Sequence, residues 1–107
     1  MRLNQLRDFV AVFDAGSIRA ASRKLGVSQP GLTKSVRLLE EELGSTLMHR
    51  TSRGVTLTPA GRSFLAHARA VHVELARARA ELDQIAAVAD ASVTLGVAAV
   101  FGPVLIP

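Results

Sequence analysis

The chain has 107 residues, of which 49% are hydrophobic, with 13 lysines and arginines against 9 acidic residues and no cysteine. This length supports one ordinary domain, or a small domain with an appendage, and the apolar content argues against global disorder. The lack of cysteine excludes a disulfide framework and a thiolate zinc site. No apolar run approaches the ~18 residues of a membrane span, and the segment after Met1 is polar, so we expect a soluble cytoplasmic protein.

Three helices are predicted in the first 44 residues. Apolar side chains recur at helical spacing over residues 3–15, 18–25 and 29–43, and a glycine follows each run. Ser17 and Ser28 precede the second and third runs and are candidate N-caps. With a three-residue turn between the second and third helices, this arrangement is a helix-turn-helix unit.

The third helix has an apolar stripe and a polar face. Gln29 and Pro30 occupy its first turn, where the missing N–H of proline is not needed. The stripe predicted to face the core consists of Leu32, Val36, Leu39 and Leu43. The opposite face displays Gln29, Thr33, Lys34 and Arg37.

A hairpin is predicted after the third helix. Leu47–Arg50 and Val55–Thr58 suit short strands, and the turn between them carries Arg53. Because an isolated two-stranded hairpin is only marginally stable, it must rest on the helices. A hairpin after a helix-turn-helix unit is the winged arrangement.

The longest predicted helix begins at Pro59 and extends to about Val88. Its apolar residues recur every ~3.5 residues, which is typical of a coiled-coil seam. The seam consists of Phe64, Ala68, Val71, Leu75, Ala78, Leu82, Ile85 and Ala89. We expect a second copy of the helix to cover it in a homodimer, with packing back onto the first three helices as the alternative. The pattern fits parallel and antiparallel pairing equally.

The last residues change character. Val93, Leu95 and Val97 alternate with other residues, which predicts a strand. One strand is not a domain, so we expect residues 91–107 to be the truncated start of a further domain. Residues after about Ser92 should be mobile or pair with a neighbour's edge.

Basic residues are concentrated in one segment. Residues 19–53 contain seven basic residues and three acidic ones, the latter at positions 40–42. This excess suits a polyanionic partner, although an ordinary solvated surface fits it equally well. A coiled-coil interaction module whose basic head binds a protein or a lipid is the competing interpretation.

Residues 6–61 resemble the N-terminal part of LysR-type bacterial transcriptional regulators. The specific match is the combination of "AASRKLGVSQPGLTKSVRLLEEELG" with "LMHRTSRGVTLTPAG". Gly31, Lys34 and Met48 depart from the residues common in the family, and a lysine at position 34 puts base reading there in doubt. The resemblance implies a mostly α fold with a winged helix-turn-helix domain over residues 1–58, a linker and dimerisation helix over 59–90, and the start of an effector-binding domain over 91–107.

The resemblance also implies sequence-specific binding of double-stranded DNA, with the third helix in the major groove and the wing in the minor groove. Base contacts are then expected from Gln29, Pro30, Thr33, Lys34 and Arg53. Phosphate contacts are expected from Ser17, Ser28, Arg37 and Arg50. The family further implies antiparallel linker helices, a tetramer of the complete protein, and a small-molecule inducer bound by a C-terminal domain that this sequence lacks, with no cofactor in this segment.

Simpler structural roles compete with several of these assignments. Ser17 and Ser28 are helix caps first and phosphate ligands second. The acids at positions 40–42 point in different directions along a helix, so solubility and local ion pairs explain them better than catalysis. His67 and His72 lie on different sides of a helix and cannot share a metal ion. No nucleophile-and-base pattern is present, and we expect no enzyme.

Overall fold

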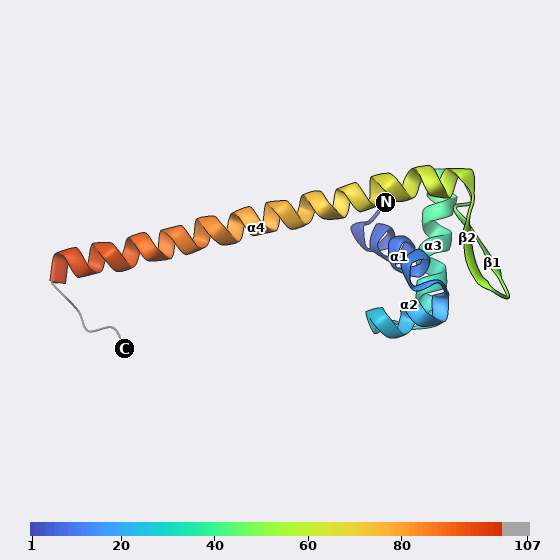
Figure 1. The fold of residues 1–107 in the computed structure, drawn as a ribbon, viewed down its shortest axis with the longest axis horizontal. Coiled ribbons are helices and arrows are strands. Elements are labelled where there is room, and N and C mark those ends of the chain that lie inside the picture. The colour runs from blue at the N-terminus through green and yellow to red at the C-terminus, as the bar shows by residue number, and fades with distance from the viewer. Residues whose placement is uncertain (102–107) are drawn as a thin grey trace. The chain divides into compact units, whose positions relative to one another are not determined.

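The computed structural model describes the backbone of residues 1–101 and the side chains of residues 1–93. The elements in chain order are α1 (Leu3–Ala15), α2 (Ile18–Leu25), α3 (Gln29–Leu43), β1 (Met48–Thr51), β2 (Gly54–Leu57) and α4 (Pro59–Phe101) (Figure 1). Residues 1–72 form one compact unit, which we call the head, and the chain from Val73 onward forms a second. The predicted fold of three helices, a hairpin and a long helix is confirmed.

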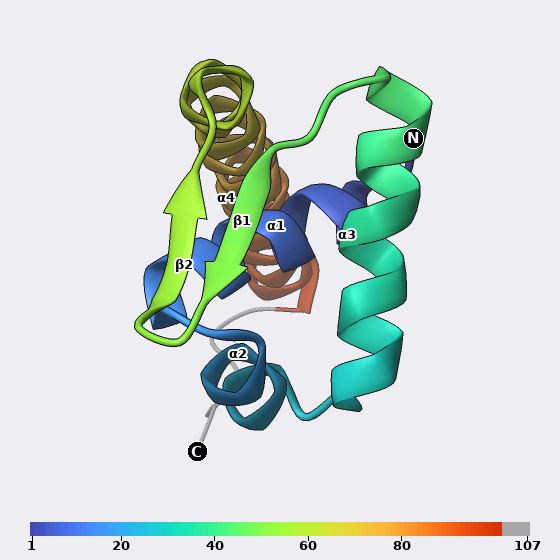
Figure 2. The same ribbon diagram turned by 90° about the vertical axis from the view of Figure 1, so that its right-hand side faces the viewer.

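The core of the head lies where α1, α3 and the first turns of α4 meet. Phe9 of α1 and Leu39 of α3 are fully buried. Phe9 also contacts Phe64 of α4, with ring centroids 6.0 Å apart. Figure 2 shows α1 between the hairpin on one side and α3 on the other. The remaining buried apolar residues are Leu6, Val12, Ile18, Ala21, Leu32, Val36, Leu47, Met48, Leu65 and Ala68.

Side-chain caps begin α2 and α3. The Ser17 hydroxyl oxygen accepts a hydrogen bond from the Ala20 N–H at 3.0 Å, and the Ser28 hydroxyl oxygen accepts one from the Gly31 N–H at 3.1 Å. These bonds satisfy backbone donors that the helix itself leaves unpaired. The two predicted N-caps are confirmed.

Hydrogen bonds between Ser22 of α2 and Val27 hold the turn between α2 and α3. Gly26 ends α2 with a φ of 68°, a left-handed conformation that glycine adopts without steric cost. The Ser22 hydroxyl donates to the Val27 carbonyl, and the Val27 N–H donates to the Ser22 carbonyl at 3.2 Å. The turn therefore has a defined geometry, which fixes where α3 starts.

Both strands of the hairpin lie one residue closer to its turn than predicted. Met48 pairs with Leu57 in the antiparallel register, whereas the strands were expected at Leu47–Arg50 and Val55–Thr58. Thr58 lies outside β2 because it caps α4. Its hydroxyl oxygen accepts from the Gly61 N–H at 2.9 Å and the hydroxyl donates to the Thr46 carbonyl at 2.6 Å.

The predicted strand near the end of the chain is wrong. The helix α4 continues to Phe101 and includes Val93 and Val97. A lone strand leaves its backbone groups unpaired, whereas a helix pairs them internally, and the alanine-rich residues before Val93 favour helix. The assignment of residues 91–107 to a further domain stays a prediction, as does their mobility, and residues 102–107 lie outside the described part of the chain. Within residues 1–101, no helix combines the length and apolar character needed to cross a bilayer.

The seam predicted along α4 is divided between two environments. Ala68 is buried in the head and Phe64 packs against the head's core. Ala68 is therefore a core residue of the head and not a dimer contact. Phe64 is half-buried, and its place in a dimer seam stays a prediction. From Val71 onward the seam is exposed, and Leu82 and Ile85 each retain 65% of their accessible surface.

An ion pair also fastens the first turns of α4 to α1. Arg69 donates to both carboxylate oxygens of Asp14, with Nη1 at 3.0 Å from Oδ2. These hydrogen bonds, opposed in part by desolvation, lower the pKa of the Asp14 carboxyl below its ordinary value of 3.8. The same bond raises the pKa of Arg69.

We expect Gly61→Ala to destabilise the head. A methyl group at this position would lie 1.8 Å from the Leu47 carbonyl oxygen, so α4 or the hairpin must shift. The loss should be about 1–3 kcal/mol in the free energy of unfolding, measured by urea titration, although alanine normally stabilises a helix relative to glycine. Ala66→Ser, which adds one atom at an exposed position of α4, is the control. An unchanged or raised midpoint for Gly61→Ala would contradict the close approach.

The Asp14–Arg69 pair predicts a pH dependence of stability. Because the folded-state pKa of Asp14 is lowered, its stabilising contribution is present above the unfolded pKa and is lost as the pH falls through the folded value. Asp14→Asn should cost at most about 1 kcal/mol at pH 7, since the pair is exposed and screened by salt. In acid the two proteins should become equally stable. Asp83→Asn, an exposed site further along α4, is the control; a difference between wild type and Asp14→Asn that persists in acid would argue against the ion pair.

Candidate nucleic-acid interface

An open groove on the head is bordered by α2, the start of α3 and β1. We call it the α2–α3 groove; it is lined by Ile18, Ser22, Gln29, Pro30, Thr33, Lys34, Arg37 and Arg50. Three of these eight side chains are basic and none is acidic. The groove therefore contains the four outward-facing residues predicted on α3 and adds α2 and the hairpin to them.

The orientation of α3 accounts for this exposure. Leu32 and Val36 are buried, and the intervening side chains turn away from the core because successive helical residues differ by about 100°. Gln29 and Lys34 are exposed, whereas Thr33 is half-buried. The predicted outward placement is thus observed, and the base and phosphate contacts remain predictions.

The start of α3 has few free backbone donors. Pro30 has no N–H, and the N–H groups of Gly31 and Leu32 donate to the side chain and the carbonyl of Ser28. Among the described residues, the N–H groups of Ser28 and Gln29 are the two at this helix start without an acceptor. A phosphate at this end would therefore meet these two backbone donors together with side chains.

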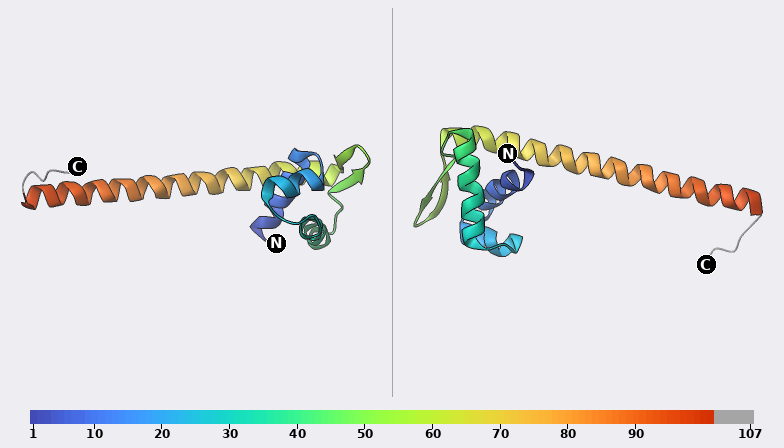
Figure 3. Two further views of the ribbon diagram at one scale, coloured as in Figure 1. Left: turned by 90° about the horizontal axis from the view of Figure 1, so that it is seen from below. Right: turned by 180° about the vertical axis from the view of Figure 1, so that it is seen from behind.

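Arg53 lies at the exposed tip of the hairpin, as predicted. Its backbone N–H donates to the Thr51 hydroxyl oxygen at 3.2 Å, and that hydroxyl donates to the Gly54 carbonyl at 3.1 Å. The Val55 N–H donates to the Gly16 carbonyl at 3.1 Å, which ties the hairpin to the end of α1. Figures 2 and 3 show the hairpin tip, α2 and the start of α3 along the same edge of the head.

Arg50 contacts α3 directly. Its Nη2 donates to the Thr33 hydroxyl oxygen at 2.7 Å. From the sequence alone, Thr33 is predicted to contact bases and Arg50 to contact phosphates. They are 17 residues apart on different elements, so no local pattern could have paired them.

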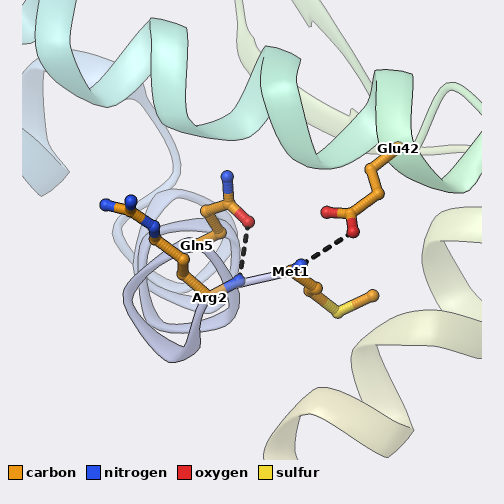
Figure 4. Close-up of polar contacts among 4 residues, drawn as sticks. All are labelled: Met1, Arg2, Gln5 and Glu42. Carbon is orange, nitrogen blue, oxygen red and sulfur yellow. Dashed lines mark hydrogen bonds and ion pairs between the residues drawn. The ribbon is translucent and has the colours of Figure 1, made fainter.

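The acidic residues of α3 lie outside the groove lining. Glu40 accepts hydrogen bonds from the Leu47 N–H at 2.6 Å and the Met48 N–H at 3.4 Å, so it orders the entry to β1. Its predicted role in solubility and local ion pairs is wrong. Glu42 forms an ion pair with the amino group of Met1 at 2.7 Å, beside the Arg2–Gln5 contact (Figure 4).

Asp8 is buried, and its burial is not among the sequence predictions. Its carboxylate accepts hydrogen bonds from the Arg7 guanidinium at 2.9 and 3.1 Å. An acid on the apolar face of a helix next to a basic residue was the available signal. Within the part of the chain that the structure describes, no three histidine or acidic side chains come together as a metal site.

Comparison with known proteins identifies the family. Residues 3–62 match the family described as bacterial regulatory helix-turn-helix protein, lysR family. The transcriptional regulator ClcR of Pseudomonas putida is 49% identical over 81 residues, covering 74% of this chain and 28% of that protein. TcbR of Pseudomonas sp. (strain P51) is 42% identical over 90 residues, covering 84% of this chain and 30% of that protein. The chain therefore spans less than a third of the length of these relatives.

Solved structures agree with this match. The CbnR DNA-binding domain in complex with DNA is 42% identical, with a TM-score of 0.71 over 81% of this chain and 99% of that one. The BenM DNA-binding domain in complex with the catB site 1 DNA is 38% identical, with a TM-score of 0.77 over 80% of this chain and 97% of that one. The chain belongs to the LysR family of bacterial transcriptional regulators, and its head is their winged helix-turn-helix DNA-binding domain.

Proposed function

We propose that the head binds double-stranded DNA in a sequence-specific way, with the start of α3 in the major groove and Arg53 in the adjacent minor groove. The observation that carries this proposal is the α2–α3 groove, whose charged lining residues are all basic and whose lining includes the exposed side chain of Gln29. A glutamine amide can bond adenine at two positions, and the pyrrolidine ring of Pro30 can contact a thymine methyl group. Lys34 supplies a mobile positive charge, so its contribution to base reading is weaker than that of a forked arginine.

The remaining residues of the surface hold the duplex in register. Arg37 and Arg50 are exposed within the groove and suit phosphate contacts, as do the hydroxyl groups of Ser17 and Ser28 beyond their capping bonds. Arg53, at the exposed end of the hairpin, suits a narrow A·T-rich minor groove, which attracts arginine. Phosphate contacts make the affinity fall steeply with salt.

The exposed part of α4 supports a homodimer. The exposed residues that follow the seam spacing are Val71, Leu75, Ala78, Leu82 and Ile85. The four larger ones, all but Ala78, are 37–65% exposed. A second α4 would cover them and place two heads on two half-sites of a partly palindromic operator.

The complete protein would work in the cytoplasm as an effector-controlled regulator, as a dimer or a tetramer. LysG of Corynebacterium glutamicum, 30% identical to this chain, has a structure with a bound arginine effector. We propose that the inducer of this protein binds a domain beyond the head, which requires no cofactor in residues 1–93.

Gln29→Ala should reduce discrimination rather than general affinity. Loss of an amide that bonds one base should cost about 1–3 kcal/mol on a selected duplex and little on a random one. Arg37→Ala should weaken binding to both duplexes. It should also reduce the slope of log affinity against log salt concentration by the contribution of about one phosphate contact. Arg79→Ala, exposed on α4, is the control. Fluorescence anisotropy against both duplexes at several salt concentrations measures all three; equal loss on both duplexes for Gln29→Ala would contradict base reading.

Leu82→Glu should dissociate the dimer. Two buried leucines would be lost for each dimer at about 1.5–3 kcal/mol each, so the dissociation constant should rise at least about a hundredfold. Ala80→Glu adds the same charge at an exposed position off the seam and should leave the dimer intact. Sedimentation equilibrium measures both, and a Leu82→Glu protein that remains dimeric would contradict pairing through this face.

A further inference from the structure

The Thr33 hydroxyl oxygen already accepts a hydrogen bond from another residue of the chain. Arg50 Nη2 donates to it at 2.7 Å, a hydrogen bond from a charged donor. A threonine hydroxyl has one proton to donate and two lone pairs to accept with, and Arg50 uses one lone pair. What remains for a base is the proton and one lone pair beside a cation.

The guanidinium biases what Thr33 can do next. Donation from a cation polarises the hydroxyl, which makes its proton a better donor and its oxygen a poorer acceptor. A second donor approaching the same oxygen would also be repelled by the positive charge of Arg50. Thr33 is therefore set to donate into the groove rather than to accept from it.

The backbone that carries Arg50 is fixed beside α3 by the hairpin. Arg50 lies in β1 opposite Val55 of β2, and the Val55 N–H is bonded to the Gly16 carbonyl at 3.1 Å. The side chain of Arg37 lines the same groove but forms no hydrogen bond or ion pair within the described part of the chain. The two arginines thus share a surface and a charge but differ in their link to Thr33.

We propose that Arg50 is a positioning residue for specificity, which holds Thr33 as a hydrogen-bond donor so that the base facing it must present an acceptor. This inference rests on the proposed function and deepens it. In the major groove guanine, adenine and thymine each offer an acceptor, whereas cytosine offers only its amino donor. Cytosine is therefore disfavoured at the base position that faces Thr33.

The test compares two arginine variants that lose the same charge from the same groove. Duplexes are first selected from a random pool with the wild-type chain, and each base of the preferred half-site is then changed singly. Thr33→Val, which replaces the hydroxyl by a methyl group of similar size, identifies the position that Thr33 reads. Affinities are measured for the wild type, Arg50→Met, Arg37→Met, Thr33→Val and the Arg50→Met/Thr33→Val double variant, with thermal unfolding to establish that each is folded.

At the position identified by Thr33→Val, the wild type should penalise cytosine by about three- to tenfold, the strength of one hydrogen bond. Arg50→Met should reduce this penalty to within about twofold, while Arg37→Met retains it even though both bind all duplexes more weakly. The double variant should show the same base preferences as Thr33→Val alone.

Three results would overturn the inference. Arg50→Met with the full cytosine penalty would show that Thr33 needs no partner to orient it, and an accepted cytosine in the wild type would contradict the donor role. Base preferences unaffected by Thr33→Val would also defeat it, while leaving the proposed DNA recognition intact. A wild-type chain that binds selected and random duplexes equally would instead defeat the proposed function itself.

Discussion

The packing of the α3 stripe against α1 is the interaction on which the rest of the structure depends. Burial of Leu32, Val36 and Leu39 fixes the rotation of α3 about its own axis. A rotation by one residue, about 100°, would expose three side chains whose burial stabilises the fold by about 1.5–3 kcal/mol each. The outward direction of Gln29 and Lys34 is therefore a consequence of the core, and these exposed side chains themselves need contribute nothing to stability.

The hairpin is positioned mainly by backbone groups. The Leu47 carbonyl accepts from the Thr58 N–H at 3.0 Å, and Glu40 accepts from the first N–H groups of the hairpin. Gly61 allows α4 to approach that carbonyl more closely than any other residue could. Because these contacts do not involve the side chains of Arg50 and Arg53, the attachment of the wing to the helices does not depend on either arginine.

Local signals predicted most of the fold and the outward face of α3. Helical period, serine caps and terminal glycines act within a few residues, so the bounds of α1, α2 and α3 could be read from the sequence. The Arg50–Thr33 and Glu40–Leu47 bonds could not, since they join separate elements. The strand predicted at Val93 failed because three alternating residues are weak against the helix that precedes them.

The same limit applies to the apolar seam of α4, because the sequence pattern does not say what covers it. The apolar period runs without interruption from Phe64 to Ala89, and a period reports that a face is covered without reporting by what. Within the head, Phe9 and the Asp14–Arg69 pair hold the first turns, so Ala68 has its partner in the same chain. Beyond Val71 the apolar stripe continues and its side chains become more exposed. A partner helix whose apolar residues repeat with the same period could bury this stripe along its length. A second α4 meets that condition by symmetry. The change in exposure near Val71, rather than the pattern itself, marks where the packing of the seam within the head ends.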